Sequence, residues 1–438
     1  MVAFETTTIF ILHCNRQHLK RTTMEIFSKF GKWKFVGIIN PIIIAAITII
    51  VILSSCKSKT NEKTYDELWK IAHKICENNI ILDAHIDWPD KHLSFPEDIS
   101  KKTTKGDFDF VRSKDGGLNA VLSVAYINSN FGVDEGRIIV DSVIRLISGY
   151  AYNYPDKFAQ ADNPHDINEN FRNNLLSLPF CLENGMPIGN DLSYLKYLKD
   201  KGCVYITLNH NKVNQISDSN FDDNRKWNGL SPFGLEVIKE MNRLGIMIDI
   251  SHSTDSTVFQ SLRYSVAPII ASHSSCRHFT PGLERNLSDT LIKAIAEKNG
   301  VIMVNLCSMF LDSICMKNCS YLLNWYQTNG VDMDSDEGID FARKYAETHQ
   351  IKSNSEQVVD HIEHIIKLAG IDYVGIGSDY DGMGPSQPTD LPDVSSYPTL
   401  VFELLKRGYK EDDIKKILSG NFLRVWNEVI KIADSLTN

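Results

Sequence analysis

The sequence has no basic stripe and no long run of lysine or arginine, and its formal net charge is -9. Proteins that bind nucleic acid carry clustered positive charge, so nucleic acid is excluded as a partner. The carboxyl-terminal "IADSLTN" is polar and lacks the apolar tail of a glycolipid anchor signal. This composition argues against that mode of membrane attachment.

The nine cysteines lack the paired CxxC spacing of structural zinc sites. In an oxidising compartment Cys315 and Cys319 could pair across "CMKNC", but the odd number of cysteines leaves at least one thiol free unless it pairs between chains. Small core positions are the simpler interpretation for Cys181, Cys203 and Cys307. The sequence thus contains no cysteine-based zinc motif.

Residues 36–53 form a long apolar run without charges, "VGIINPIIIAAITIIVIL", which follows several lysines. The run ends in "LSSC", which resembles the lipobox of bacterial lipoproteins, where small residues precede a cysteine that is lipidated and becomes the mature amino terminus. The resemblance implies that residues 1–55 are an export segment and that Cys56 is the lipid anchor. Residues 1–23 precede a second methionine, Met24, so this stretch is a candidate upstream extension that is not translated.

An uncleaved signal anchor is the alternative for the same run, which is long enough to span a membrane, although Asn40 and Pro41 weaken it. Both interpretations place the globular part outside the cytoplasm. We therefore expect an exported protein of the cell envelope, attached to a bacterial membrane on its periplasmic or surface side. Residues 56–65 would be the linker that follows the anchor.

The rest of the chain is rich enough in apolar residues, at 43% overall, to bury a large core. Short apolar runs rich in β-branched residues alternate with helical patterns, which predicts parallel strands. Eight such units favour a (β/α)8 TIM-like barrel over residues 66–438, although a doubly wound sheet would give a similar pattern. The predicted strands lie within residues 79–87, 118–127, 175–183, 203–210, 246–252, 267–273, 300–306 and 373–379.

The segments between these runs show helical periodicity, as in "DLSYLKYLKDKG" and "PFGLEVIKEMNRLG", the second of which ends at a glycine. The least regular region is residues 308–352, which contains "GVDMDSDEG". We expect it to be an insertion or a helical excursion after the seventh strand.

Most of the predicted strands end in a polar side chain that can bind a metal or take part in catalysis. The carboxyl ends of all strands of a barrel share one face, so these side chains are expected to converge on one pocket. By the alternation of a strand, Asp83, His85 and Asp87 point to the same side, with Asp83 deeper as a buried acceptor. The strand-end residues are His85, Asp87, Glu183, His210, His252, His273 and Asp379.

Three histidines and two carboxylates are a ligand set for two divalent metals, and both ligand types suit zinc. One bridging carboxylate would hold the two ions ~3.5–4 Å apart, the spacing of two-metal hydrolases, and a water between them would ionise near neutral pH. A single histidine is more often a structural residue, but several at consecutive strand ends indicate a metal centre.

The same residues resemble those of the membrane (renal-type) dipeptidase family, peptidase family M19 of the metal-dependent amidohydrolase superfamily. The motifs follow the family's order over roughly residues 66–430, which is more specific than one short motif. "DAHIDWP" is similar to the family's DGHNDLP pattern, and "ENG" stands in place of its EGG segment. The other motifs are "YITLNHNKVN", "IMIDISH", "IIASHSSCR", "LERNLSD", "VVDHIEHIIKLAGIDYVGIGSDYDG" and "SGNFLRVW".

The resemblance implies a role for each matched residue. His85 and Asp87 would bind one zinc ion, His252 and His273 the other, and Glu183 would bridge both. His210 would stabilise the oxyanion of the substrate carbonyl, Arg285 would bind the substrate carboxylate, and Asp379 would carry the proton. One residue more than usual separates His273 from the arginine, so Arg277 is an alternative that would otherwise brace the loop.

Other candidates have stronger structural interpretations. His361 and His364 are three apart on a probable helix and lack a third ligand in the pattern, so both are expected to be structural. Asp381 is expected to cap or support the loop that turns at Gly382. Three aromatic residues could line a substrate pocket but are more often core or rim: Trp88, Tyr126 and Trp227.

These observations together predict an exported, lipid-anchored dipeptidase with two zinc ions per chain, in which a metal-bridging hydroxide attacks the peptide carbon. The resemblance also implies tolerance of a C-terminal D residue. One rival is another amidohydrolase reaction, such as lactone, phosphoester or deaminase chemistry, but those enzymes usually start with an HxH pair and often bridge with a modified lysine. A binding lipoprotein without catalysis is the second rival, and a homodimer remains one option for the oligomeric state.

Overall fold

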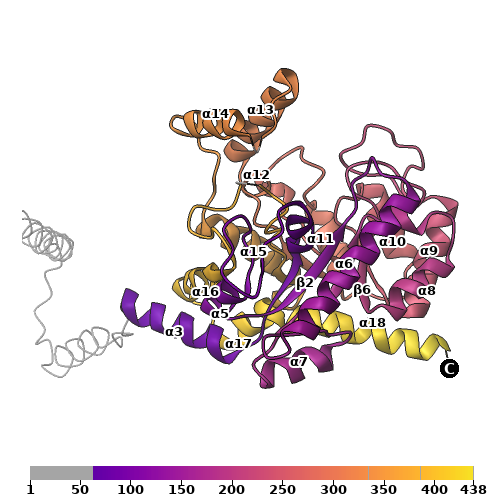
Figure 1. Ribbon diagram of the computed structural model, residues 1–438, viewed down its shortest axis with the longest axis horizontal. Coiled ribbons are helices and arrows are strands. Elements are labelled where there is room, and N and C mark those ends of the chain that lie inside the picture. Colours follow the sequence, from indigo (N-terminus) through magenta and orange to yellow (C-terminus); the bar gives the residue numbers. More distant parts are fainter. Residues whose placement is uncertain (1–62, 334, 385, 438) are drawn as a thin grey trace, which may run out of the picture. The chain divides into compact units, whose positions relative to one another are not determined.

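The computed structural model describes residues 63–333, 335–384 and 386–437 (Figure 1). The predicted export segment 1–55, the predicted anchor Cys56 and most of the predicted linker lie outside the described residues. The first described helix, α3 (Tyr65–Asn78), begins at a capping box in which the Thr64 and Glu67 side chains accept from each other's backbone N–H. Everything from Thr64 onward forms one folding unit.

Within the described residues, ten strands form a single sheet in which all the pairings are parallel. Eight of the strands form the wall of a barrel, in the spatial order in which they follow one another along the chain. They are β1 (Ile81–Ile86), β2 (Leu118–Tyr126), β5 (Phe180–Glu183), β6 (Cys203–Thr207), β7 (Met247–Asp249), β8 (Ile269–Ala271), β9 (Val301–Val304) and β10 (Val374–Ile376).

The wall closes between its first and last strands. Ile86 bridges Tyr380 in the parallel sense, the Asp87 N–H donates to the Tyr380 carbonyl at 2.9 Å, and the Asp379 N–H donates to the His85 carbonyl at 3.0 Å. Closure confirms the predicted (β/α)8 barrel and the eight predicted strand positions, and it leaves no open sheet edge in the wall. The bonds that close it lie among the predicted site residues.

Two apolar clusters explain why the strands are hydrophobic on both faces. One fills the barrel interior, with Leu122, Met247 and Met303 as members, and is covered at one end by Phe422 and Trp426 of α18 (Asn421–Thr437). The other lies between the strands and the surrounding helices and includes Ile86, Val121, Ile206, Ile302 and Val304. Burial on both faces removes the polar alternation of a half-exposed strand.

Helices surround the barrel and pack their apolar stripes on it (Figure 1). The helices before β8 are α4 (Trp88–Ser94), α5 (Phe110–Gly116), α6 (Val133–Asn153), α7 (Pro164–Arg172), α8 (Ser193–Asp200), α9 (Pro232–Leu244) and α10 (Asp255–Tyr264). The later ones are α11 (Asp289–Glu297), α15 (Ser355–Ala369), α16 (Tyr397–Lys406) and α17 (Glu411–Lys415), and the short strands β3 (Phe158–Ala159) and β4 (Leu176–Ser177) extend the sheet beside β2.

Helix α9 shows how local sequence sets an element. The Ser231 side chain caps it by accepting from the Gly234 N–H at 2.8 Å, and Pro232 occupies the first turn. Gly245 ends it in the left-handed conformation, with φ 70°. The predicted helix and its glycine stop are both confirmed.

The irregular region after the seventh strand is a helical excursion, as predicted, made of α12 (Ser308–Leu311), α13 (Ser313–Asn329) and α14 (Asp336–Ala346). In Figure 1, α13 and α14 stand away from the barrel. Cys315 and Cys319 lie one turn apart on α13, and all seven cysteines of the described residues are buried free thiols. No helix within the described ranges has both the length and the apolar composition needed to cross a membrane.

Candidate metal centre

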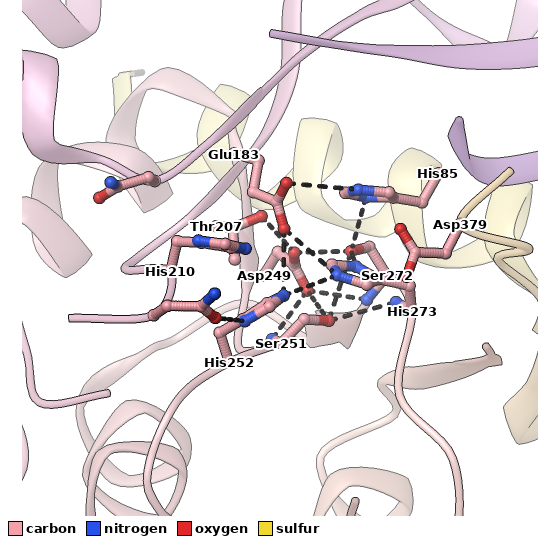
Figure 2. Close-up of polar contacts among 12 residues, drawn as sticks. His85, Glu183, Thr207, His210, Asp249, Ser251, His252, Ser272, His273 and Asp379 are labelled. Atoms are coloured by element: carbon pink, nitrogen blue, oxygen red, sulfur yellow. Dashed lines mark hydrogen bonds and ion pairs between the residues drawn. The ribbon is translucent and has the colours of Figure 1, made fainter. Parts of the chain in front are cut away.

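The predicted site residues come together at the carboxyl ends of the barrel strands (Figure 2). His85 lies on β1, Asp87 directly precedes α4 and makes no side-chain capping bond to it, and Glu183 is the last residue of β5. The other residues follow the ends of β6, β7, β8 and β10 in the loops that leave the barrel: His210, His252, His273 and Asp379. Segments up to 294 positions apart in the sequence, from residue 85 to residue 379, thus form one site.

Glu183 stands between two groups of potential ligands. Its Oε2 lies 3.6 Å from His85 Nε2, and Asp87 Oδ2 lies 3.6 Å from the same nitrogen. Its Oε1 lies 3.2 Å from His252 Nε2 and 3.2 Å from His273 Nε2. One oxygen of a single carboxylate therefore faces each group, which is the arrangement required of a ligand that bridges two metal ions.

The hydrogen bonds around His85 fix its tautomer. Its Nδ1 lies 2.8 Å from the Tyr205 hydroxyl, and that hydroxyl donates its own proton to the Ala84 carbonyl at 2.9 Å. Tyr205 can therefore only accept from His85, so Nδ1 carries the proton. Nε2 is then the nitrogen that faces Glu183 and Asp87.

The other two histidines are oriented in the same way. Ser272 Oγ donates to Asp249 Oδ2 at 2.7 Å and therefore accepts from His273 Nδ1, which lies 2.7 Å away. His252 Nδ1 donates to Asn211 Oδ1 at 3.2 Å, because an amide oxygen only accepts. In all three rings Nδ1 is thus held by a hydrogen-bond partner and Nε2 faces the centre of the site, the orientation in which a histidine ligand binds a metal.

Two buried polar atoms at the centre have no hydrogen-bond partner within the described part of the chain: His85 Nε2 and Asp87 Oδ1. Leaving such atoms unsatisfied is costly unless a ligand pairs with them. In addition, the Nε2 atoms of His252 and His273 face each other at 3.0 Å. The donor set mixes imidazole and carboxylate groups, its Nε2 atoms converge, and one carboxylate oxygen is unpaired. These features fit a pair of divalent cations.

The pKa values of the three histidines in the metal-free protein also favour a cation at this site. Burial and the charge of Arg285 hold the pKa values of His252 and His273 well below the ordinary value, so both are neutral. Burial opposes the charged form of His85, but Glu183 and Asp87 outweigh it and raise the pKa of His85 well above its usual range. A proton on His85 offsets the excess negative charge, and a metal ion would replace it.

Asp379 lies beside these ligands, and one of its oxygens falls within the same cluster as His85 and His273. Its Oδ2 accepts from Asn305 Nδ2 at 2.9 Å. Burial and the neighbouring charge of Asp87 raise the pKa of Asp379 to about 7. A carboxyl group with this pKa can both take and give a proton near neutral pH.

The His210 ring packs against the ring of His252, with centroids 4.2 Å apart, and edge-on against Tyr126 at 4.9 Å. Burial lowers the pKa of His210, so the imidazole is neutral. Its Nδ1 is buried and has no partner within the described residues. Of the three candidate pocket aromatics, Tyr126 lies against a site residue, whereas Trp88 is a core residue that donates to Ser123 Oγ and Trp227 donates to the Asn214 carbonyl.

The structure gives the two candidate arginines, Arg277 and Arg285, different environments. Arg277 forms a bidentate ion pair with Asp255 at 2.6 and 2.9 Å and donates to the Asn286 carbonyl, so it braces its loop. Arg285 is fully buried at the site, where it donates to Ser274 Oγ, to the His273 carbonyl and to His252 Nε2. Across the described residues no carboxylate is hydrogen-bonded to Arg285.

Asp83 departs from the expected alternation. The β1–β2 register shifts between Asp83 and Ile86, so Asp83 does not follow His85 into the centre. Its Oδ1 accepts from the His85 and Ser378 N–H groups, and its Oδ2 accepts from the Tyr397 hydroxyl of α16. Asp83 is a buried acceptor, as expected, and it ties β1 to the segment after β10.

Two other predicted supporting residues are also structural. Asp381 Oδ1 accepts from the Asp107 N–H at 2.6 Å, which joins the loop after β10 to the segment before α5. Fully buried His361 accepts from the Cys276 N–H at Nδ1 and donates from Nε2 to the Leu311 carbonyl, so both its nitrogens are used within the fold.

Sequence reasoning missed the residues that orient the ligands, chiefly Tyr205, Asp249 and Ser272. Asp249 is fully buried, and it accepts from Ser272 and from Thr207 Oγ1 at 2.5 Å. The signal for Asp249 was present, because "IMIDISH" has an ionisable residue inside an apolar strand, as "ILDAHID" does. Tyr205 and Ser272 carried no comparable signal, since either residue is ordinary in a buried strand.

Comparison with known sequences agrees with this geometry. The profile of the membrane dipeptidase family (peptidase family M19) matches residues 69–438. The dipeptidase tcpJ of Claviceps purpurea is 29% identical over 367 residues, which cover 81% of this chain and 78% of that protein. The dipeptidase aclJ of Aspergillus oryzae is 30% identical over 341 residues, or 76% of this chain and 72% of that protein.

Solved structures share the fold. The probable dipeptidase PvdM from Pseudomonas aeruginosa superposes with a TM-score of 0.72 at 25% identity, covering 84% of this chain and 99% of that one. A metallopeptidase from Rhodobacter sphaeroides, liganded with a phosphinate mimic of the dipeptide L-Ala-D-Ala, gives a TM-score of 0.67 at 21% identity, covering 80% and 100%. The family match, the barrel and the donor set at its strand ends lead to one conclusion: the chain belongs to the membrane dipeptidase family and is a metallopeptidase that hydrolyses dipeptides.

Proposed function

We propose that this dipeptidase works with two zinc ions, one held by His85 and Asp87, the other by His252 and His273, with Glu183 between them. The observation that carries the proposal is the split of the Glu183 carboxylate, with Oε2 toward one group and Oε1 toward the other. Two zinc ions bound there would lower the pKa of a water between them and so supply a hydroxide nucleophile near neutral pH.

The chain's own residues would bind and orient the peptide. Arg285 is a buried cation without a carboxylate partner within the described residues, which is costly unless an anion completes the site. A free C-terminal carboxylate of a dipeptide has the required charge and matches a guanidinium in shape. Coordination by His252 would also release Arg285 Nη2 from its present bond to His252 Nε2, 3.2 Å away.

His210 and Asp379 would act on the reacting atoms. A neutral His210 with its N–H toward the substrate carbonyl would stabilise the oxyanion as charge develops there. Asp379, with a pKa of about 7, would accept the proton of the attacking water and pass it to the departing amine. The free amino group of the substrate would lie at the opposite end from Arg285, and this double recognition limits the substrate to two residues.

The deciding experiment compares wild-type protein with Asp379→Asn on L,L and L,D dipeptides in the presence of zinc. The expected result is a fall in kcat of ~10²- to 10⁴-fold, the usual contribution of a general acid–base, with zinc content unchanged. Asp191→Asn, which alters a half-exposed carboxylate, serves as the control. Full activity in Asp379→Asn with bound zinc would remove the proposed proton relay.

We also propose that a C-terminal D residue is accepted. The proposal is supported by the resemblance to the dipeptidase family and by the L-Ala-D-Ala mimic bound to the R. sphaeroides relative. Turnover of L,D dipeptides in the same assay is the expected result. Turnover confined to L,L dipeptides would contradict it.

The location of the enzyme is a further proposal, which is based on the "LSSC" sequence. We propose that Cys56 is lipidated and holds the barrel on the outer side of a bacterial membrane. Cys56→Ser is expected to abolish incorporation of a labelled fatty acid and to release the protein from the membrane fraction. Unchanged labelling of Cys56→Ser would disprove the anchor.

A further inference from the structure

A second group of metal-binding side chains lies on other elements than the catalytic centre. His278 lies in the short 3-10 helix η2 (Arg277–Phe279), Asp289 is the first residue of α11, and His364 lies on α15. Each residue offers one ligand atom, and the three atoms lie within 4.8 Å of one another. His278 is exposed and the other two are partly buried, so the group is open to solvent.

The three side chains already contact one another in pairs through His364. His364 Nε2 lies 2.8 Å from Asp289 Oδ1, so the imidazole donates its Nε2 proton to the carboxylate. The His278 ring stacks on the His364 ring, with centroids 4.4 Å apart and an angle of 18° between the planes. A divalent metal would replace the shared proton and receive lone pairs from two imidazoles and one carboxylate.

The three elements are held in place without the metal. One turn before His364 on α15, His361 uses Nδ1 to accept from the Cys276 N–H at 2.9 Å, which fixes the start of the η2 turn against the helix. On the third element, the Ser288 side chain caps α11 by accepting from the Leu291 N–H. Ligands on elements fixed in this way are preorganised, which is what separates a site from a chance group of side chains.

We propose that His278, Asp289 and His364 form a third divalent-metal site, separate from the catalytic centre and suited to zinc. Two imidazoles and a carboxylate leave at least one coordination position to water, which is typical of a zinc site with three protein ligands. Bound metal would link the loop that follows His273 to α15. Because this loop carries Arg285, metal bound at the site would make the substrate-binding loop more rigid.

Zinc content per chain is the direct test. Full-length wild-type protein and His278→Ala are saturated with zinc, gel-filtered, and measured by inductively coupled plasma mass spectrometry. His278→Ala is expected to hold about one zinc ion fewer per chain than wild type, whatever number the catalytic centre takes. The test does not depend on turnover, so it can fail while the proposed catalytic function stands.

His165→Ala is the matched control, because His165 is exposed and has carboxylate oxygens of Asp166 and Glu169 at 3.9 Å without a second imidazole. It is expected to keep the wild-type zinc content, and a second variant, His364→Gln, is expected to behave like His278→Ala. Crystals grown with zinc should show an anomalous peak ~2.0–2.2 Å from the three ligands. Equal zinc content in wild type, His278→Ala and His364→Gln would overturn the proposal.

Discussion

The chemistry of this site is set by single hydrogen bonds that decide where protons lie. Tyr205, Ser272 and Asn211 each accept a hydrogen bond from Nδ1 of one histidine, so that all three Nε2 atoms face Glu183. Burial is the main cause that lowers the pKa values of His252 and His273, and the positive charge of Arg285 adds to it, so both are neutral. The fold thereby orients all three histidines before any metal arrives, and zinc would displace the additional proton of His85.

Arg285→Lys tests the substrate-binding role of this cation. Lysine keeps the charge but loses the bidentate geometry, so kcat/KM for a dipeptide is expected to fall by ~10- to 150-fold, equivalent to the ~1.5–3 kcal/mol of a charged hydrogen bond. The measurement is steady-state hydrolysis of a dipeptide and of the same dipeptide with an amidated C-terminus.

The amide supplies an internal control for that variant. Wild-type protein should lose activity on the amide, whereas Arg285→Lys should show little difference between the two substrates. Arg277→Lys, which alters the loop arginine paired with Asp255, should retain the wild-type preference. A loss in Arg285→Lys that is equal for both substrates would assign Arg285 a purely structural role.

The ionisation of the site predicts how zinc stabilisation varies with pH. Burial raises the pKa of Asp87 to about 6, and burial with Asp87 raises that of Asp379 to about 7. Both groups ionise near pH ~3.9 in the unfolded chain. Their contribution to the stability of the metal-free protein is therefore complete below about pH 4 and is lost as the pH rises toward 7.

Zinc should reverse this loss, because it replaces protons on the same side chains. The rise in Tm on adding zinc is expected to be larger at pH 7.5 than at pH 5, and zinc binding should release protons, as measured by calorimetry in buffers of different ionisation enthalpy. Zinc affinity that does not vary between these pH values would contradict the proposed ligand set.

At the level of elements, the loop after β10 has to pass very close to the metal ligands. A Cβ at Gly382 would lie 2.7 Å from Asp379 Oδ1 and closer still to Asp87 Oδ2. The same loop makes the bonds that close the barrel against β1. Glycine is thus required at position 382 because the loop passes close to Asp87 and Asp379. This close approach explains the turn that the sequence predicts at Gly382.

Gly382→Ala is expected to weaken zinc binding by ~10- to 100-fold, the usual effect of displacing a group that supports metal ligands, while the far-ultraviolet circular dichroism stays unchanged. Zinc affinity is measured by competition with a chelator. Gly149→Ala on α6 is the control, because a Cβ there meets no atom within 4 Å. Wild-type zinc affinity in Gly382→Ala would show that the loop can move aside.

At the scale of the whole barrel, the amino-terminal ends of the strands are packed under α18 and contribute to stability, whereas the carboxyl-terminal ends carry the metal ligands. Trp426 and Phe422 of α18 pack on the interior cluster that includes Val204 at the start of β6 and Val301 at the start of β9. The metal ligands lie at the other ends of these strands. Changes in α18 should therefore affect unfolding without altering the site.

Trp426→Ala is expected to lower the free energy of unfolding by ~3–5 kcal/mol, the usual effect of removing a fully buried tryptophan. Urea unfolding followed by circular dichroism measures this change, and zinc content measured in the absence of urea should match the wild type. A loss of zinc in the folded Trp426→Ala protein would contradict the separation of the two ends.

The sequence predicted the barrel from apolar runs at regular intervals, because its strands are buried on both faces, but the same pattern also allowed a doubly wound sheet. The bonds that join the first and last strands decided between the two. It also indicated most ligand candidates, since residues such as His85, Glu183 and His273 stand at strand ends, where an ionisable side chain is out of place unless it serves a site. The motifs around them resembled one family, which the comparisons show this chain to belong to.

Only the tertiary structure decided which atoms meet. The register shift in β1 turned Asp83 away from His85, and the ion pair with Asp255 withdrew Arg277 and left Arg285 at the site. The tautomers depend on Tyr205 and Ser272, which reach the histidines from neighbouring strands. Periodicity along a chain determines which face is buried, whereas hydrogen-bond partners far apart in sequence are determined only when the barrel closes.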